Sequence, residues 1–412
     1  MTHPAPDERE ELELPPAAEP ATEMIVTGRI DGKPTIGLVL KRTYKIGPRG
    51  GWEPAPDDDQ EVVVDEELPY EEVEPPFDSP VFHGSDVMFR PLTDIVVQGS
   101  AHARSSGVGK LTVGLRIESL KRDITVYGER RVERASGGLR LSEPEPFETI
   151  PIRYDRAYGG VDLHAFYSNP SPMLARVQRN SPGLPVLASS RYHYPRNPTG
   201  VGFLISMAPY QLEDLLVPSL EFPFDPITAD RLAVGTVASW PNGPLPAGMD
   251  WSSAAWFPRE SYLGHHSLPE GYGGRIIERE LGWAPADLLE IPLFTRSETP
   301  IRAAYAQGAS PGMSIPLELE RIRQGIPAKL VNLHPGQPEL RMELPREWPE
   351  ARLDLGGLSM TALAPSLSAV VIRPDDEEVV MVWHATADES RERMPEEYAA
   401  MRFDVAWRRD PR

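Results

Sequence analysis

The chain has 412 residues, with 46 prolines, 33 glycines and no cysteine. Proline at about 11% of the chain, roughly twice the usual share, excludes a mostly helical bundle, because each internal proline removes a helix hydrogen bond and clashes with the preceding turn. The lack of cysteine excludes disulfides, thiolate metal sites and cysteine nucleophiles, and the net charge of −20 repels phosphate backbones and anionic lipid headgroups, which argues against nucleic-acid and membrane-surface partners.

The N-terminal part of the chain is the most acidic. Residues 1–80 carry 20 acidic and 7 basic side chains, and residues 1–23 combine this charge with few apolar groups. The composition predicts a disordered acidic tail over residues 1–23. This tail lacks the basic and apolar regions of a secretory signal, and the chain has no apolar run of the roughly 18 residues that a transmembrane helix requires. We therefore expect a cytoplasmic protein without membrane insertion.

Residues 24–154 are rich in β-forming runs that are separated by turn signals. A hairpin is predicted over Met24–Ile46, turning at Asp31 and Gly32, a residue pair that readily supplies positive φ. Further strands are predicted at Glu61–Val64, Leu92–His102, Lys110–Ile117 and Asp123–Glu133. Successive extended runs of this kind indicate an antiparallel β-sandwich or barrel.

Residues 155–313 have a different character, with many glycines, prolines, asparagines and aromatic residues and little periodicity. Four of the eight tryptophans lie in this part, namely Trp240, Trp251, Trp256 and Trp283. The pattern predicts long ordered loops that pack across a sheet, because a buried tryptophan can fix a segment that lacks a β-ladder. Short helices are predicted at Tyr210–Leu216 and Pro285–Leu289.

Regular patterns return over residues 314–390. Strands are predicted at Ala328–Leu333, Glu339–Leu344, Leu367–Arg373 and Glu378–His384. The last two form a hairpin with a type I turn around Pro374 and Asp375. A short helix (Pro395–Arg402) and a tail are predicted for residues 391–412.

We therefore expect one mainly β domain over residues 24–390, with antiparallel sandwich-like or barrel-like sheets, long ordered loops and a few short helices. Its N- and C-terminal β runs should pack into one body, because the middle part has too little regular structure to fold alone.

No residue pattern for catalysis or metal binding stands out. His265 and His266 are adjacent, so their side chains point in different directions, and Asp57–Asp59 lacks the glycine and distal glutamate of a calcium loop. No metal or cofactor is predicted.

A carbohydrate- or ester-active hydrolase that uses a carboxylate pair in the aromatic-rich middle part is an alternative, although nothing in the sequence selects the pair. The available carboxylates are Asp155, Asp214, Glu221, Asp250 and Glu260.

Several short strings are more distinctive in their order along the chain. They are LVLKRTYKI (Leu38–Ile46), Ser85-Asp86, Arg90-Pro91, TDIVVQGSAHA (Thr93–Ala103), VYGER (Val126–Arg130), PFETIPIRYDRAYGG (Pro146–Gly160), NPTGVG (Asn197–Gly202), PSLEFP (Pro218–Pro223), Trp256 with Arg259, Gly264, LVNLHP (Leu330–Pro335), Leu344-Pro345 and Val382-Trp383. In this order, from about Met24 to His384, the chain resembles the bacterial domain-of-unknown-function family 2169. It departs from the family pattern at Arg90, Asp155, Tyr158 and His384, where lysine, glutamate, phenylalanine and arginine are usual, and over Ala309–Gly325, which is expanded.

The resemblance implies a non-enzymatic adaptor or chaperone encoded with a type VI secretion system. Such a protein binds a toxic effector, often linked to the PAAR spike tip, and helps to load it onto the secretion spike. A structural component exported with the spike is a further alternative. The implied partners are the effector and a spike or PAAR-type protein, with no nucleic acid. An effector segment could bind by strand addition to an open sheet edge or in a groove between loops.

The candidate partner-binding residues are Arg156, Tyr158, Asn197, Trp256 and Arg259. Arg156, Asn197 and Trp256 also have a structural interpretation, which we favour. Arg156 has Asp155 or Asp94 as a possible ion-pair partner, and the loop around Asn197 holds Pro and two Gly in six residues, as expected of a brace with unusual backbone dihedrals. Trp256 is interpreted as packing between segments, with an interface anchor as the alternative.

Overall fold

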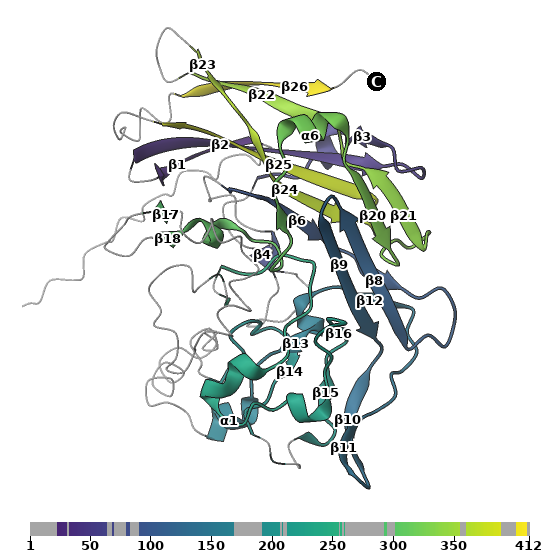
Figure 1. Cartoon of the computed structure of the whole chain (residues 1–412). Coiled ribbons are helices and arrows are strands. Elements are labelled where there is room, and N and C mark those ends of the chain that lie inside the picture. Colours follow the sequence, from purple (N-terminus) through teal and green to yellow (C-terminus); the bar gives the residue numbers. More distant parts are fainter. Residues whose placement is uncertain are drawn as a thin grey trace, which may run out of the picture.

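The computed structural model describes residues 23–30, 33–63, 68–69, 80–82, 90–168, 192–206, 208, 212–254, 256–257, 259, 292–294, 301–354, 360–388 and 401–409. These residues are mainly β, as the sequence predicts, and their sheets do not close into a barrel (Figure 1). Among the helices in this part of the chain, none combines the length and the apolar character that crossing a bilayer demands. The predicted tail over residues 1–23 lies outside the described residues except for Glu23, which begins the first strand.

The largest sheet joins strands from both ends of the chain (Figure 1). Its strands, in spatial order, are β1 (Glu23–Ile30), β2 (Lys33–Ile46), β25 (Glu378–Asp388), β24 (Ser366–Arg373), β6 (Thr93–Val97) and β19 (Ser314–Ile315), with β3 (Trp52–Pro54) also paired to β2. β1 and β2 form the predicted hairpin, in which Ile30 pairs with Lys33. β2 pairs antiparallel with β25 from Thr35↔Asp388 to Lys45↔Glu378. The strand pairing thus holds the N- and C-terminal β runs in one body.

A second sheet of five antiparallel strands packs against the first. Its order is β16 (Leu220–Glu221), β9 (Leu120–Tyr127), β8 (Lys110–Ile117), β20 (Pro327–Val331) and β21 (Glu339–Glu343). The two sheets share one hydrophobic core, to which Leu40 on β2, Leu115 on β8 and Trp383 on β25 contribute fully buried side chains. Burial of each such side chain stabilises the fold by about 1.5–3 kcal/mol. The arrangement is sandwich-like.

Smaller sheets extend this body. They are β11 (Gly138–Leu141), β10 (Arg130–Ala135) and β15 (Leu216–Val217); β23 (Met360–Leu363), β22 (Glu347–Asp354) and β26 (Arg402–Arg409); β12 (Thr149–Pro151) with β7 (Ser100–His102); β13 (Tyr158–Gly159) with β14 (Val201–Gly202); β17 (Pro292–Phe294) with β18 (Ile301–Arg302); and β4 (Leu68–Pro69) with β5 (Pro80–Phe82). The short helices are α1 (Leu163–Ser168), α6 (Leu319–Gln324) and the 3-10 turns η1 (Asp57–Asp59), η2 (Tyr154–Arg156), η4 (Ala229–Arg231), η5 (Val237–Asn242) and η7 (Ala303–Ala306).

The irregular middle part contributes to two hydrophobic clusters. Trp251 and Trp256 belong to the core of the two large sheets. A second cluster gathers aromatic side chains, with the rings of Tyr158 and Trp240 each in edge-to-face contact with Tyr194, at centroid distances of 4.9 and 5.9 Å. Aromatic pairs of this geometry add to the stability that burial supplies. In the described parts of residues 155–313, aromatic packing therefore helps to hold the loops against the sheets.

Three local predictions are corrected. Glu61 to Val63 form no strand, because their backbone groups bond to side chains of β2: the Glu61 N–H donates to the Thr43 hydroxyl over 3.0 Å, and the Val62 carbonyl oxygen accepts from the Lys41 ammonium over 2.8 Å. The predicted helix Tyr210–Leu216 ends in a strand, since Leu216 pairs with Arg131 across to β10. The predicted tail contains β26, which pairs along the whole of β22. The predicted helices Pro285–Leu289 and, apart from its last two residues, Pro395–Arg402 lie outside the described residues.

Candidate functional site

The YDRAYGG and NPTGVG boxes pack against each other backbone to backbone. β13 of the first box pairs in parallel with β14 of the second, and the Gly160 amide donates to the Asn197 carbonyl oxygen over 2.9 Å. Gly160 has φ +97°, and a Cβ atom placed on it would lie 2.3 Å from the carbonyl oxygen of Gly200. Only a residue without a Cβ fits this close approach in this backbone conformation. We call residues 154–160 and 197–202 the glycine clasp.

Asn197 fastens the glycine clasp with its side chain. It is fully buried, and its amide Nδ2 donates to the carbonyl oxygens of Tyr154 and Tyr158 over 2.8 and 3.2 Å. Its Oδ1 accepts a hydrogen bond from the Thr199 hydroxyl over 2.8 Å. The side chain is thus held on both sides by the protein itself, as a buried polar group requires. Asn197 is therefore a brace in this structure, and its contact with a partner stays a prediction.

Tyr158, Trp256 and Arg259 are buried as well. The Tyr158 hydroxyl donates to the Leu232 carbonyl oxygen over 2.8 Å, and burial raises the pKa of Tyr158 well above its usual value. The Trp256 ring meets the Tyr154 ring edge to face at 5.2 Å. The Arg259 guanidinium donates to the carbonyl oxygens of Ser252 and Tyr305. These side chains are 0–6% exposed, so in this conformation they pack inside the protein, and their contact with a partner stays a prediction.

Arg156 is the one predicted contact residue with an exposed side chain. Half of its side-chain surface is open, and its Nε lies 3.7 Å from an Asp155 carboxylate oxygen. That carboxylate is engaged by Arg153 through two hydrogen bonds of 3.2 Å. The other partner considered for Arg156, Asp94, is fully buried beside Arg90. The Arg156 guanidinium is therefore positioned by the glycine clasp and remains open to solvent.

Arg156 and Asp155 line a surface pocket of about 250 Å³, which we call the Arg156 pocket. Its other walls are residues 128–129, 145–147, 149–151, 201, 216–217 and 219. Partly buried apolar side chains such as Phe147, Ile150 and Leu216 give it an apolar surface, while Glu129 and Glu145 add exposed carboxylates. Two of its walls are strands with an open edge, because within the described residues β12 pairs only with β7 and β15 only with β10.

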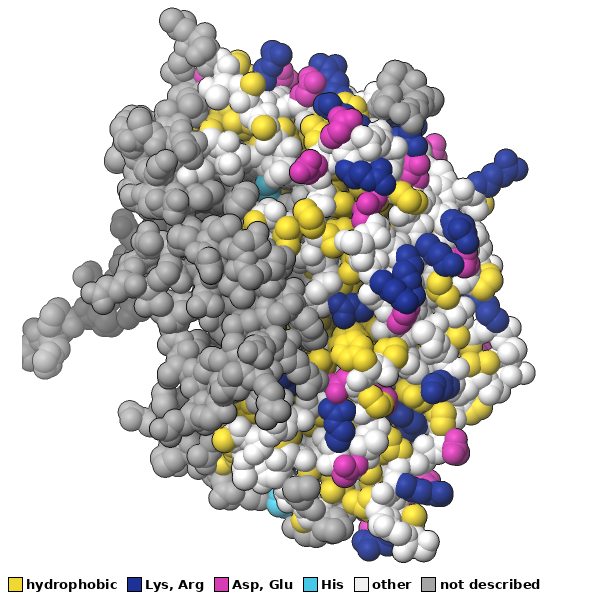
Figure 2. Space-filling view, viewed as in Figure 1, with side chains coloured by type: hydrophobic (Ala, Val, Ile, Leu, Met, Phe, Trp, Pro, Cys, Tyr) yellow, Lys and Arg dark blue, Asp and Glu magenta, His cyan; other side chains and the backbone are white. Residues whose placement is uncertain are grey.

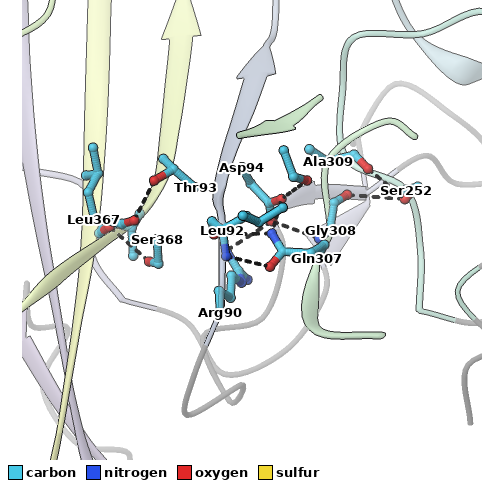
Figure 3. Close-up of polar contacts among 12 residues, drawn as sticks. Arg90, Leu92, Thr93, Asp94, Ser252, Gln307, Gly308, Ala309, Leu367 and Ser368 are labelled. Atoms are coloured by element: carbon cyan, nitrogen blue, oxygen red, sulfur yellow. Dashed lines mark hydrogen bonds and ion pairs between the residues drawn. The ribbon is translucent and has the colours of Figure 1, made fainter. Parts of the chain in front are cut away.

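A buried polar network holds the middle part of the chain against the largest sheet (Figure 3). Asp94, on β6, is fully buried and accepts hydrogen bonds from the Gln307 amide, the Gly308 backbone N–H and the Ser314 hydroxyl over 2.7, 2.8 and 2.6 Å. The Arg90 guanidinium lies 3.7 Å from its carboxylate. The Gln307 side chain also exchanges hydrogen bonds with both backbone groups of Leu92, as Figure 3 shows. Asp94 thus joins segments more than two hundred residues apart.

The carboxylates of the hydrolase alternative lie in dissimilar settings. Glu221 forms a buried ion pair with Arg130 at 2.5 Å. Asp250 is fully buried and accepts from Gln98 over 3.1 Å. Asp214 is largely exposed, and Glu260 lies outside the described residues. The contacts of Glu221 and Asp250 are those of structural ion pairs and hydrogen bonds.

The YDRAYGG and NPTGVG boxes lie in the part of the chain that matches a known protein family. A family described as "Uncharacterized protein conserved in bacteria (DUF2169)" matches residues 31–384, which is most of the chain. The chain belongs to the DUF2169 family. Neither the curated proteins nor the solved structures yield a match.

The distinctive strings of the sequence map onto the elements just described. The T-D string supplies the buried Asp94, and the V-Y-G-E-R string supplies Arg130 for the ion pair with Glu221 of the P-S-L-E string. The two glycine boxes form the glycine clasp. Most of these strings therefore specify the scaffold, and several of them also supply walls of the Arg156 pocket, among them Phe147, Ile150 and Arg156. The sequence did not point to Leu216, which joins this wall only through the fold.

Metal-ligating patterns were not predicted, and His265 and His266 lie outside the described residues. Asp57–Asp59 form the exposed turn η1. Among the described residues, no three His, Asp or Glu side chains gather in a way that could hold a metal ion.

The buried His384 predicts an acid sensitivity. Its ring is buried and neither ring nitrogen has a hydrogen-bond partner among the described residues. Burial, aided by the nearby Arg90 charge, lowers the pKa of His384 to about 3. The unfolded chain takes up this proton below about pH 6.5 whereas the folded chain does so only near pH 3, so stability falls as pH falls through this window.

When the pH is lowered from 6.5 to 5, protonation of His384 in the unfolded chain should reduce the free energy of unfolding by about 2 kcal/mol. Urea unfolding of the wild type and of His384→Gln at both pH values measures this. We expect the variant to lose less stability on acidification than the wild type by that amount. The same loss in both proteins would show that His384 is not held neutral in the folded state.

Proposed function

We propose that this DUF2169 protein is a non-enzymatic adaptor, working in the cytoplasm, that binds a toxic effector of a type VI secretion system. It helps to load that effector onto the secretion spike, in association with a PAAR-type or other spike protein. The observation that carries the proposal is the Arg156 pocket, in which the YDRAYGG box presents a half-exposed arginine beside residues of the strands β12 and β15. Arginine and partly buried apolar side chains are typical anchors of protein interfaces.

The pocket suits an extended segment of the effector. Such a segment can add to the open edge of β12 or β15 through main-chain hydrogen bonds, while its side chains fill the apolar part of the pocket. Glu129 is paired with Arg131 at 2.9 Å and Asp155 with Arg153 at 3.2 Å, so the half-exposed Arg156 can receive one acidic group of the segment. The net charge of −20 also favours a basic effector, such as a cationic toxin, over an acidic one.

The proposal is tested in the bacterium that encodes the chain. The tagged protein, purified from those cells, should recover a toxin together with spike or PAAR-type proteins. Deletion of its gene should abolish secretion of that toxin while the spike is still secreted. Undiminished secretion of every recovered toxin in the deletion strain would contradict an adaptor role.

A further inference from the structure

The five-stranded sheet carries four basic residues in one line across four strands. On its antiparallel strands Lys121 (β9) pairs with Arg116 (β8), Arg116 pairs with Lys329 (β20), and Lys329 pairs with Arg341 (β21). Residues directly opposite one another in a sheet lie on the same face. We call Lys121, Arg116, Lys329 and Arg341 the basic row.

The basic row lies on the outer face of the sheet. The residues that precede or follow its members, such as Leu115, Leu330 and Leu340, point into the core and are at most 2% exposed. The row itself is open to solvent, with side chains 67% exposed at Lys121 and 75% at Arg341. Lys and Arg side chains gather on this side of the molecule (Figure 2).

The basic row has more positive charge than its neighbours neutralise. Asp123 lies 2.6 Å from Arg116 and 3.9 Å from Lys121, and Glu339 lies 2.5 Å from both Lys329 and Arg341. Two carboxylates are therefore paired with four cations, which leaves the basic row with a positive charge. Hydrogen bonds from Lys329 and Arg341 lower the pKa of Glu339, so this carboxylate is ionised. Its negative charge is one of the two that already offset the row. Like charges directly opposite in a sheet are destabilising, and an anion bound along the row would relieve that repulsion.

The row borders a pocket of about 470 Å³ at the ends of these strands. Arg116, Lys329 and Arg341 line it together with Arg321 of α6, which is held by Glu118 at 2.6 Å. Guanidinium groups match the planar shape of a carboxylate and bind it through paired hydrogen bonds. The pocket therefore suits carboxylate side chains.

We propose that the basic row binds an extended acidic peptide segment of a partner protein. Four neighbouring strands place the ends of the row about 14 Å apart, and alternate residues of an extended peptide lie about 7 Å apart on one side. A segment with glutamate at every second position therefore presents three carboxylates over the same length. A long nucleic acid fits less well, because its further phosphates would meet a chain of net charge −20. This site is independent of the Arg156 pocket and of the adaptor role.

Fluorescence anisotropy with a labelled peptide of alternating Glu and Ser tests the proposal on the full chain. The double variant Lys121→Gln, Arg341→Gln removes the two most exposed cations of the row and should weaken binding about tenfold, which is about 1.4 kcal/mol. The matched control Arg134→Gln, Arg140→Gln removes two equally exposed cations on β10 and β11 and should leave the affinity within about twofold. Raising the salt from about 50 to about 200 mM should weaken wild-type binding.

Equal affinities of the wild type and the row variant would overturn the proposal, as would an equal loss in the control. Tighter binding of a single-stranded DNA of the same charge than of the acidic peptide would assign the row to nucleic acid and also overturn it. Both double variants change only exposed side chains, and thermal melting of each variant verifies that it is folded.

Discussion

Replacing Gly160 by alanine should destabilise the folded chain by about 3 kcal/mol or more. Two costs contribute: the left-handed backbone at φ +97° costs a residue with a Cβ about 1–2 kcal/mol, and forcing a methyl group into packed surroundings costs about 1–3 kcal/mol. The contact cannot relax easily, because the atom in the way is the backbone oxygen of Gly200. Gly200 is itself packed against the Ala157 carbonyl oxygen.

Gly137→Ala is the matched control for this prediction. Gly137 lies before β11 with no atom within 4 Å of the added Cβ, so its replacement should change stability by no more than about 0.5 kcal/mol. Chemical denaturation of both variants gives the comparison. Similar midpoints for the two variants would mean that the glycine clasp is not closely packed in solution.

Asp94→Ala should cost about 3–5 kcal/mol, a loss typical of breaking a buried, hydrogen-bonded ion pair. The substitution leaves the Gln307 amide, the Gly308 N–H and the Ser314 hydroxyl without their acceptor. It also removes the carboxylate that faces the buried Arg90. Asp94→Asn should cost less, because one oxygen can still accept hydrogen bonds while the charge is lost.

The control for this prediction is Asp58→Ala in the exposed turn η1, which should leave stability unchanged within about 0.5 kcal/mol. The free energy of unfolding from urea titration measures all three variants. A loss below about 1 kcal/mol for Asp94→Ala would show that the network of Figure 3 contributes little to joining the middle part to the sheet.

Strands with strong local patterns could be predicted from the sequence. The run Lys110–Ile117 is β8 with the same bounds, and the hairpins around Gly32 and Pro374 were recognised from their turn residues. β22 was missed because Pro349 and several charged residues interrupt its pattern. It is a strand because β26 and β23 pair with it on its two sides. Such pairings join residues that are far apart in sequence, and local pattern does not reveal them.

The candidate site was predicted in part. The ordered strings identified the segments that meet in the glycine clasp, and the side chain of the candidate Arg156 is half exposed, while its contact with a partner stays a prediction. Whether Tyr158 or Asn197 faces solvent or the core depends on contacts with Leu232 and Tyr154, which no local pattern specifies. The basic row could not be predicted either, because it exists only through the registers of β9, β8, β20 and β21.

The affinity of the recovered effector for wild type and for Arg156→Ala tests the central claim most directly. If the Arg156 pocket holds the effector, the variant should bind about thirtyfold or more weakly, as expected for the loss of an interface anchor worth about 2 kcal/mol. Its melting temperature should stay close to that of the wild type, because the side chain is half exposed. Arg140→Ala, at an exposed arginine on β11, should bind as the wild type does. Wild-type affinity of the folded Arg156→Ala variant would contradict the assignment of this pocket.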